Sequence, residues 1–163
     1  MNILKYFRSI RKKHSGQKIV FCSGTFDLPH AGHVIFFEDC KKYGDILVVT
    51  VGSDNAVRHA KGPNRPILNE HVRLKIISGL RTVDYAVIEG DIRNNNLLAH
   101  LERTFASLKP DLYVINEDAF DILYRKNLAR QYNIPLKILK RSAPPHLRGI
   151  STSAIIAKIK SLE

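Results

Sequence analysis

Short apolar runs alternate with amphipathic segments along the chain after Gly16. Five of these runs are rich in Val and Ile and lack a polar alternate face, as expected of strands that helices cover on both sides. They lie at residues 18–22, 46–51, 84–88, 111–115 and 135–139. Between them, apolar residues recur at helical spacing, as in Leu97, Leu101 and Phe105. The pattern predicts a doubly wound α/β fold, a parallel five-stranded sheet with helices on both faces.

Two further segments each place three apolar residues on one helical face. They are Val72, Ile76 and Leu80, and Ile155, Ile159 and Leu162. In a doubly wound fold, such faces are expected to pack on the sheet. Asn69 and Ser151 are suited to cap the starts of these two helices, and Gly44 to close the helix that follows the first strand.

The charge is unevenly distributed along the chain. The formal net charge of +11 arises from 26 basic and 15 acidic side chains and favours anionic partners. Six basic residues fall within the first 18 positions, and no acidic residue accompanies them: Lys5, Arg8, Arg11, Lys12, Lys13 and Lys18. The total length of 163 residues suits one domain. We therefore divide the chain into a basic N-terminal helix or arm, residues 1–16, and one domain, residues 17–163.

The N-terminal segment has two interpretations. Its apolar side chains recur at helical spacing, which favours a peripheral amphipathic helix: Ile3, Tyr6, Phe7 and Ile10. The alternative is an arm that binds nucleic acid, but aromatic residues are not interleaved with the basic ones beyond Tyr6 and Phe7. We expect no specific nucleic-acid binding. We also expect deletion of residues 1–16 to leave the rest of the domain intact.

The sequence also bears on location and redox state. No apolar stretch approaches the roughly 20 residues of a membrane span, and the first residues do not resemble a secretory signal. A cytoplasmic protein is expected. Cys22 and Cys40 are the only cysteines, and we expect them to be reduced, packed thiols.

The stretch "GTFDLPHAGH", residues 24–33, runs from the carboxyl end of the first predicted strand into the first following helix. Ligands of doubly wound sheets bind at such ends. The two histidines allow a metal site, a structural turn, or an anion site formed with the free N–H groups of the helix. The other histidines are scattered, which disfavours a metal site. The position favours the anion site.

These residues resemble the HxGH signature of the nucleotidyltransferase superfamily of small cytidylyltransferases and adenylyltransferases. The similarity extends from about Lys18 to Lys158. Residues 18–67 are similar to the adenylyltransferase domain of ADP-heptose synthases. The segment "RGISTSAII" instead resembles the "GISTT" segment of glycerol-3-phosphate cytidylyltransferases. The resemblance implies a Rossmann-like nucleotidyltransferase fold.

The resemblance also implies a reaction. A phosphorylated sugar or polyol attacks the α-phosphate of CTP or ATP, takes up the nucleoside monophosphate and releases pyrophosphate. Pantetheine or flavin precursors are alternative acceptors, and a nucleic-acid-binding module is the alternative outside the enzymes. A phosphate monoester has a second pKa of about 6 and is already an oxyanion at neutral pH, so positioning and charge stabilisation suffice. We expect Mg²⁺ as cofactor, carried by the phosphates without a protein cage, and a homodimer.

Motif matches assign the site residues. His30, His33 and Lys61, the last in an expected loop, are the candidate catalytic residues. Asp27 either orients a phosphate-bound Mg²⁺ or fixes the turn. The candidate nucleotide-binding residues are Thr25, Phe26, Asp27, Arg73, Arg148, Gly149, Ile150, Ser151, Thr152 and Ser153. Arg141 is the alternative to Arg148, because His146 stands where the cytidylyltransferase pattern has an arginine. The candidate base or acceptor region is Asn116, Glu117 and Asp118, in which Asn116 stands where the family usually has a glycine.

Overall fold

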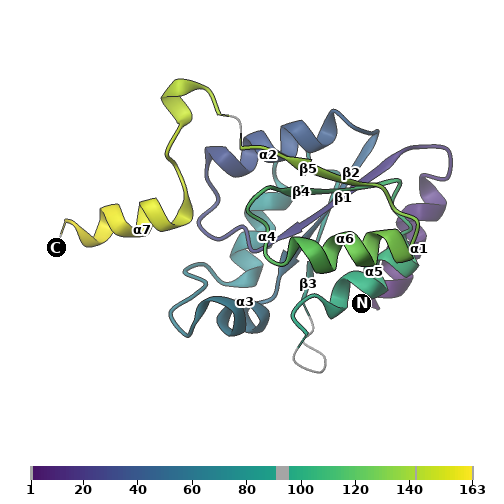
Figure 1. Ribbon diagram of the computed structural model, residues 1–163, viewed down its shortest axis with the longest axis horizontal. Helices are drawn as coiled ribbons and strands as arrows, with labels where there is room; N and C mark the ends of the chain where they lie inside the picture. The colour runs from purple at the N-terminus through teal and green to yellow at the C-terminus, as the bar shows by residue number, and fades with distance from the viewer. Residues whose placement is uncertain (1, 91–95, 142, 163) are drawn as a thin grey trace.

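The computed structural model describes residues 2–90, 96–141 and 143–162. Its centre is a parallel sheet in the order β3-β2-β1-β4-β5 (Figure 1). The strands are β1 (Ile19–Gly24), β2 (Ile46–Gly52), β3 (Tyr85–Glu89), β4 (Leu112–Asn116) and β5 (Leu136–Leu139). Each predicted strand is present, with bounds that differ by two residues at most. The predicted fold class is confirmed.

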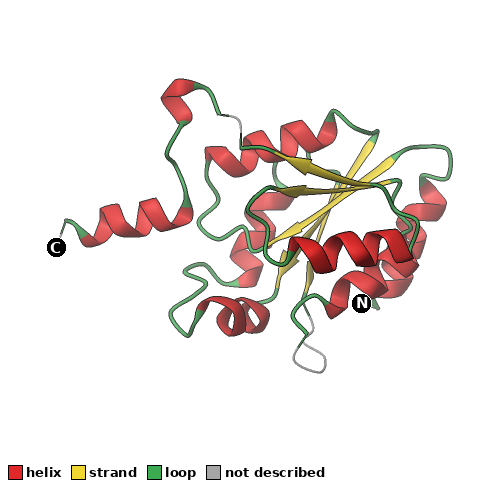
Figure 2. Cartoon of the chain, in the orientation of Figure 1, coloured by secondary structure: helices red, strands yellow, loops and turns green. Residues whose placement is uncertain are grey.

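Alternating side chains of the strands build two cores, one on each face of the sheet. Ile19 and Phe21 of β1 point into one core, and Val20 and Cys22 into the other. The first core is covered by α1 (Ile3–Lys13), α5 (Ala99–Leu108) and α6 (Ile122–Gln131), and the second by α2 (Ala31–Lys41) and α4 (Glu70–Ser78). Figure 2 shows the sheet between these helices. The helices therefore lie on both faces, as predicted.

The N-terminal helix α1 belongs to the main core. Phe7 is 0% exposed and Ile10 2% exposed, and both pack in the same cluster as residues of α5. Arg11 forms an ion pair of 2.8 Å with Asp111, just before β4. It also donates to the carbonyl oxygens of His14 and Gln17. Residues 3–13 are thus built into the domain, in contrast to the peripheral helix expected from the sequence.

Two apolar helix faces do not pack as the sequence predicted. In α4, Val72 and Ile76 are exposed, and the helix instead buries Arg73 and Ile77. The final helix, α7 (Thr152–Lys160), has no buried residue and projects from the body of the protein (Figure 1). Helical spacing identifies an apolar stripe, but the position of a helix relative to the sheet decides whether that stripe is covered.

Several smaller predictions can be checked directly. Asn69 and Ser151 cap α4 and α7 through their side chains, as expected. The helix α2 ends at Lys41, with Lys42 as its C-cap, so Gly44 lies beyond the helix end. A Cβ at Gly44 would lie 2.7 Å from the carbonyl oxygen of Lys18, so this glycine serves a close approach of two backbones.

Two further expectations concern the state of the cysteines and the presence of membrane-spanning helices. Cys22 and Cys40 are buried free thiols, as predicted, and burial raises the pKa of Cys22. Across the part of the chain that the structure describes, none of the helices has the length and apolar character needed to cross a membrane.

Candidate active site

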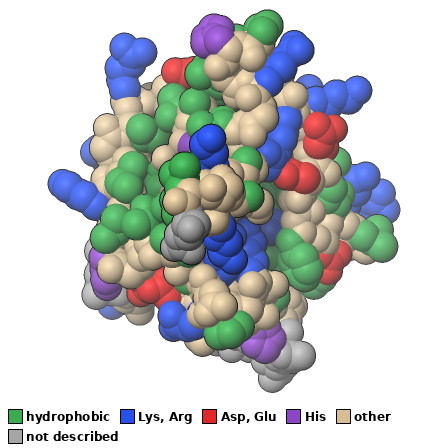
Figure 3. Space-filling model, turned by 90° about the vertical axis from the view of Figure 1, so that its left-hand side faces the viewer, with side chains coloured by type: hydrophobic (Ala, Val, Ile, Leu, Met, Phe, Trp, Pro, Cys, Tyr) green, Lys and Arg blue, Asp and Glu red, His purple; other side chains and the backbone are tan. Residues whose placement is uncertain are grey.

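A cavity of about 1180 Å³ opens at the carboxyl ends of β1, β4 and β5. The sheet continues from β1 to β2 and β3 in one direction and from β4 to β5 in the other, so the cavity lies where the strand order reverses. This is the position at which doubly wound sheets bind ligands. Figure 3 views the side from which α7 projects, where Lys and Arg side chains gather around the central hollow. Position and charge suit a phosphorylated ligand.

Most of the predicted site residues line this cavity. They are Thr25, Phe26, Asp27, His30, His33, Lys61, Asn116, Asp118, Arg148, Gly149, Ile150, Ser151, Thr152 and Ser153. Two predicted residues, Arg73 and Glu117, are not among the lining residues. The cavity therefore unites motifs that are more than 100 positions apart in the sequence.

The two histidines form the start of α2. His30 is the N-cap residue, and its Nδ1 accepts a hydrogen bond of 3.1 Å from the N–H of Gly32. Nδ1 of His33 accepts one of 3.4 Å from the N–H of His30, and the two rings stack with their centroids 3.9 Å apart. Since both Nδ1 atoms act as acceptors, each neutral ring carries its proton on Nε2. Capping thus leaves each histidine one N–H donor for a ligand.

Both histidines are held in the neutral form. Burial, followed by the charges of His30 and Arg141, lowers the pKa of His33 to about 3. Burial and the charge of Arg141 also lower the pKa of His30. At neutral pH, the pair therefore supplies hydrogen-bond donors without formal charge.

Lowering the pH from 7 to 5 is expected to reduce the free energy of unfolding. The pKa is about 3 for His33 and about 4 for buried His100, both below the usual 6.5. The unfolded state therefore takes up protons that the folded state does not. This stability is present above pH 6.5 and is lost below it, by up to about 1 kcal/mol per pH unit for each histidine. Urea unfolding at several pH values measures the slope. His33→Asn should reduce the slope without abolishing it, because the lowered pKa values of His30 and His100 still contribute, and a flat profile for the wild type would contradict the prediction.

Glycines shape the loop around the histidines. Gly32 lies under the His30 ring, and a Cβ there would be 3.0 Å from the ring carbon Cε1. At Gly24, a Cβ would be 2.8 Å from the ring of Phe26, whose backbone has a φ of 49°. A left-handed backbone at Phe26 is unfavourable for an L-residue. A side chain at either glycine would therefore displace the ring of Phe26 or of His30 from its present position.

Asp27 is occupied entirely by protein donors. Its Oδ1 accepts from the N–H groups of Leu28 and Leu68, and its Oδ2 from the Ile67 N–H and Arg65 Nε, all at 2.9–3.0 Å. Burial alone would raise the pKa of Asp27, but these backbone bonds and Arg65 outweigh it and lower the pKa. Two acceptor sites per oxygen are thereby used. Of the two interpretations of Asp27, the structure favours the residue that fixes the turn.

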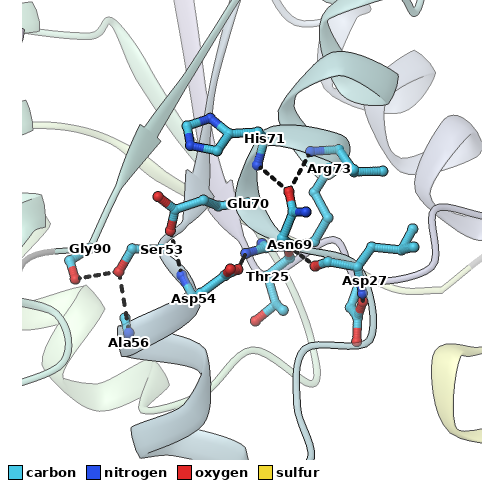
Figure 4. A network of polar contacts seen from close by, with 12 residues as sticks. Thr25, Asp27, Ser53, Asp54, Ala56, Asn69, Glu70, His71, Arg73 and Gly90 are labelled. Atoms are coloured by element: carbon cyan, nitrogen blue, oxygen red, sulfur yellow. Dashed lines mark hydrogen bonds and ion pairs between the residues drawn. The ribbon is translucent and has the colours of Figure 1, made fainter.

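Arg73 stabilises the wall of the cavity without lining it. It is fully buried, and its guanidinium donates to the Thr25 carbonyl oxygen at 2.6 Å and to the Leu68 carbonyl oxygen at 2.9 Å. Its third contact is an ion pair of 2.7 Å with Asp54, in the network of Figure 4. Arg73 therefore reaches the cavity only through the backbone of Thr25, which it holds in place.

Lys61 is placed differently from the sequence expectation. It is the last residue of α3 (Asp54–Lys61), and the loop begins only at Gly62. Its side chain still lines the cavity. Burial and the nearby charge of Arg65 lower the pKa of Lys61. Because Lys61 belongs to a helix, its backbone is fixed in position at the edge of the cavity.

The C-terminal segment contributes residues 143, 144 and 147–153 to the lining of the cavity. Oγ1 of Thr152, in the first turn of α7, donates to the carbonyl oxygen of Asp27 at 2.8 Å. Both arginines considered for the final motif line the cavity. Arg148 donates to the carbonyl oxygen of Ala143, and Arg141 forms an ion pair with Asp118. The carboxylate of Glu117 accepts from the N–H of Arg141 and so supports this segment from outside the cavity.

The cavity residues that the sequence analysis did not single out include Ser23, Arg65 and Arg125. Ser23 is the last residue but one of β1, and a polar residue directly after an apolar run is an available signal. Arg65 lies in the loop that follows Lys61, but its partner Asp27 is 38 positions away in the sequence. Arg125 lies in the first turn of α6, where a basic residue is unusual because the helix dipole disfavours it.

Fold and site together define the class of this protein as Rossmann-like with an HxGH histidine pair at the switch point of the sheet. The sequence profile of the family described as cytidylyltransferase-like matches residues 21–158. The chain belongs to the cytidylyltransferase-like family. The predicted nucleotidyltransferase is thereby confirmed at the level of the family.

The most similar proteins include bacterial relatives named bifunctional protein HldE. The chain is 36% identical to the one from Helicobacter pylori strain HPAG1 over 148 residues, which are 91% of this chain and 29% of the relative. It is 34% identical over 145 residues to the one from Pseudomonas savastanoi pv. phaseolicola, covering 88% of this chain and 28% of the relative. The chain thus spans less than a third of the length of these relatives.

Two solved structures share the fold. The lipopolysaccharide core biosynthesis protein from Thermoplasma volcanium is 32% identical, with a TM-score of 0.64 over 79% of this chain and 99% of that chain. The pantoate-beta-alanine ligase from Francisella tularensis is 17% identical, with a TM-score of 0.63 over 96% of this chain and 75% of that chain. The second likeness concerns the fold alone.

Proposed function

We propose that the protein transfers a nucleoside monophosphate from ATP or CTP to a phosphorylated sugar, with release of pyrophosphate. The observation that carries this proposal is the pair of neutral histidines, each with one Nε2–H donor, at the start of α2 in the cavity. The name of the lipopolysaccharide core biosynthesis protein, together with the resemblance of residues 18–67 to ADP-heptose synthases, favours a sugar phosphate over a polyol, pantetheine or flavin acceptor.

The residues of the cavity suit this transfer. His30 and His33 would donate to the oxygens of the α-phosphate, where negative charge develops as the bond to pyrophosphate breaks. Lys61 would neutralise charge on the phosphates. Ser151, Thr152 and Ser153 lie at the start of α7, where hydroxyl and N–H groups suit the β- and γ-phosphates. Positioning by these groups suffices because the acceptor phosphate brings its own oxyanion.

Magnesium is the proposed cofactor. Among the described residues, no three His, Cys, Asp or Glu side chains gather in a way suited to a metal ion, and both oxygens of Asp27 are occupied by protein donors. The residues therefore suit an ion held by the triphosphate rather than by a protein cage. Such an ion neutralises charge on the leaving pyrophosphate.

Removal of divalent ions with excess EDTA is expected to lower turnover by at least about 100-fold, because the triphosphate would then enter the basic cavity with its charge unneutralised. Pyrophosphate release before and after chelation measures this loss. Added Mg²⁺ should restore turnover to the same protein sample. Unchanged turnover in EDTA would contradict the proposal for the metal.

The reaction itself is tested by a screen for pyrophosphate release. Four nucleoside triphosphates are each combined with phosphorylated sugars, polyols and cofactor precursors. We expect release with ATP or CTP and a sugar phosphate, accompanied by a nucleotide-linked sugar in the products. Absence of release from every combination would overturn the proposed function. The homodimer and the cytoplasmic location stay predictions.

A further inference from the structure

A buried arginine lies at the cavity on the face of the sheet opposite to the histidine pair. Arg125, in the first turn of α6, is only 7% exposed, yet it lines the cavity. The histidines begin α2, which covers the other face. The first strand, β1, lies between these two helix starts, and its Ser23 also lines the cavity. The cavity therefore has polar side chains from both faces of the sheet, the histidines from one and Arg125 from the other.

The guanidinium of Arg125 is held by three neutral groups. Its Nε donates to the carbonyl oxygen of Phe120 at 2.7 Å. Its Nη1 donates to Ser23 Oγ at 3.1 Å and also to the hydroxyl of Tyr113. Among the described residues, no hydrogen-bond acceptor is recorded for Nη2. The side chain is thus fixed in orientation and retains donors.

The charge of Arg125 has no counter-charge within the described ranges, where no carboxylate forms an ion pair with it. Two other arginines of the cavity lining differ, because Arg65 pairs with Asp27 and Arg141 with Asp118. Burial raises the pKa of Tyr113, so its phenol stays neutral beside Arg125. A buried cation near a helix N-terminus is costly without an anion. The arrangement therefore points to an anionic ligand.

We propose that Arg125, held in place by the hydroxyl of Tyr113, binds the phosphate of the acceptor substrate together with the hydroxyl of Ser23. This inference rests on the proposed nucleotidyl transfer and assigns its second substrate a place. In an in-line displacement, the attacking oxygen and the leaving group lie on opposite sides of the α-phosphorus. Ser151 to Ser153 and Lys61 are suited to hold the leaving pyrophosphate. Arg125 lies in the first turn of α6, on the face of the sheet opposite to His30 and His33, and is suited to hold the attacking phosphate.

The step balances without any further reactant. An oxygen of the acceptor phosphate forms a bond to the α-phosphorus, and the bond from that phosphorus to the bridging oxygen of the β-phosphate breaks. Pyrophosphate leaves with the electron pair. No proton has to be removed, because the acceptor phosphate is ionised at neutral pH. Arg125 orients that dianion and takes part in no bond change.

Replacement of the arginine separates this role from a structural one. Arg125→Gln is expected to raise the KM for the sugar phosphate by roughly 10- to 100-fold, the loss typical of a charge-assisted hydrogen bond. The KM for the triphosphate should stay within about 2-fold, and Arg125→Lys should recover part of the loss. Arg130→Gln, an exposed arginine of the same helix, is the matched control and should behave as wild type. An unchanged acceptor KM in a folded, active Arg125→Gln protein would overturn the proposal.

A binding measurement tests the site even without turnover. Inorganic phosphate is titrated into wild type, Arg125→Gln and Arg130→Gln by calorimetry. We expect a loss of affinity of at least about 10-fold in Arg125→Gln alone. If that variant does not fold, Tyr113→Phe keeps the ring and removes only the hydroxyl, and should weaken phosphate binding by roughly 3- to 10-fold. Equal phosphate affinity in wild type and in all folded variants would overturn the site. Phosphate binding that depends on Arg125 in a protein with no pyrophosphate release would refute the proposed function and leave the anion site standing.

Discussion

Replacement of His33 by alanine is expected to lower kcat by about 10²- to 10³-fold. In the proposed reaction, the imidazole Nε2–H of His33 donates to the α-phosphate, and loss of one such donor commonly has this effect on the transition state. His30→Ala should cause a similar loss. It also removes the side-chain cap of α2, at a cost of about 1 kcal/mol of stability. Steady-state release of pyrophosphate measures kcat.

The matched control is His59→Ala, a change at an exposed histidine of α3 that should leave kcat unchanged. Circular dichroism and thermal unfolding verify that the histidine variants stay folded. A folded His33→Ala protein with turnover near that of wild type would contradict the role of the histidine pair as phosphate donors.

Deletion of residues 1–16 is expected to unfold the domain or to lower its free energy of unfolding by about 5 kcal/mol or more. The packing reverses the expectation drawn from the sequence. Phe7 and Ile10 are almost completely buried, and loss of a single large apolar side chain from a core costs about 2–5 kcal/mol. The deletion also exposes the surface of α5 that they cover. Urea unfolding of the shortened and full-length proteins measures the difference.

Two variants separate packing from charge in this helix. Phe7→Ala alone should cost about 3–5 kcal/mol. The combined change Lys5→Gln, Arg8→Gln and Lys12→Gln alters only exposed side chains and should shift stability by less than about 1 kcal/mol. A shortened protein as stable as the full-length chain would show that α1 contributes nothing to the core.

The sheet and the motif positions were predictable because they depend on local patterns. A strand buried on both faces must be apolar throughout, so the central strands β1, β2 and β4 were visible as apolar runs, and the less buried edge strands β3 and β5 as shorter ones. Parallel strands that alternate with helices place the first strand end at a binding edge, which located His30 and His33. The caps at Asn69 and Ser151 were equally local. Family resemblance then supplied the reaction.

The errors concern which helix faces are covered. In α4, Val72 and Ile76 have the spacing of a buried face, yet both are exposed. Arg73 and Ile77 are buried instead, because the guanidinium of Arg73 binds Asp54 and two backbone carbonyl oxygens. In the N-terminal segment, the dense charge suggested a peripheral helix, whereas its apolar stripe is covered by α5. The spacing of apolar residues identifies a helix face, but it does not show which element, if any, packs against that face.

The sequence by itself determined the class of fold, the strand positions, the histidine pair and the family, because each is written in a short pattern or a motif. Only the tertiary structure decided that Arg73 holds the backbone of Thr25 in place and that protein donors occupy both carboxylate oxygens of Asp27. It also decided that Arg125 reaches the cavity without an ion-pair partner. These roles depend on distances between residues far apart in the chain. Arg125 meets Ser23 across 102 positions. Burial and charge compensation arise only when folding brings such groups together, so a linear pattern cannot contain them.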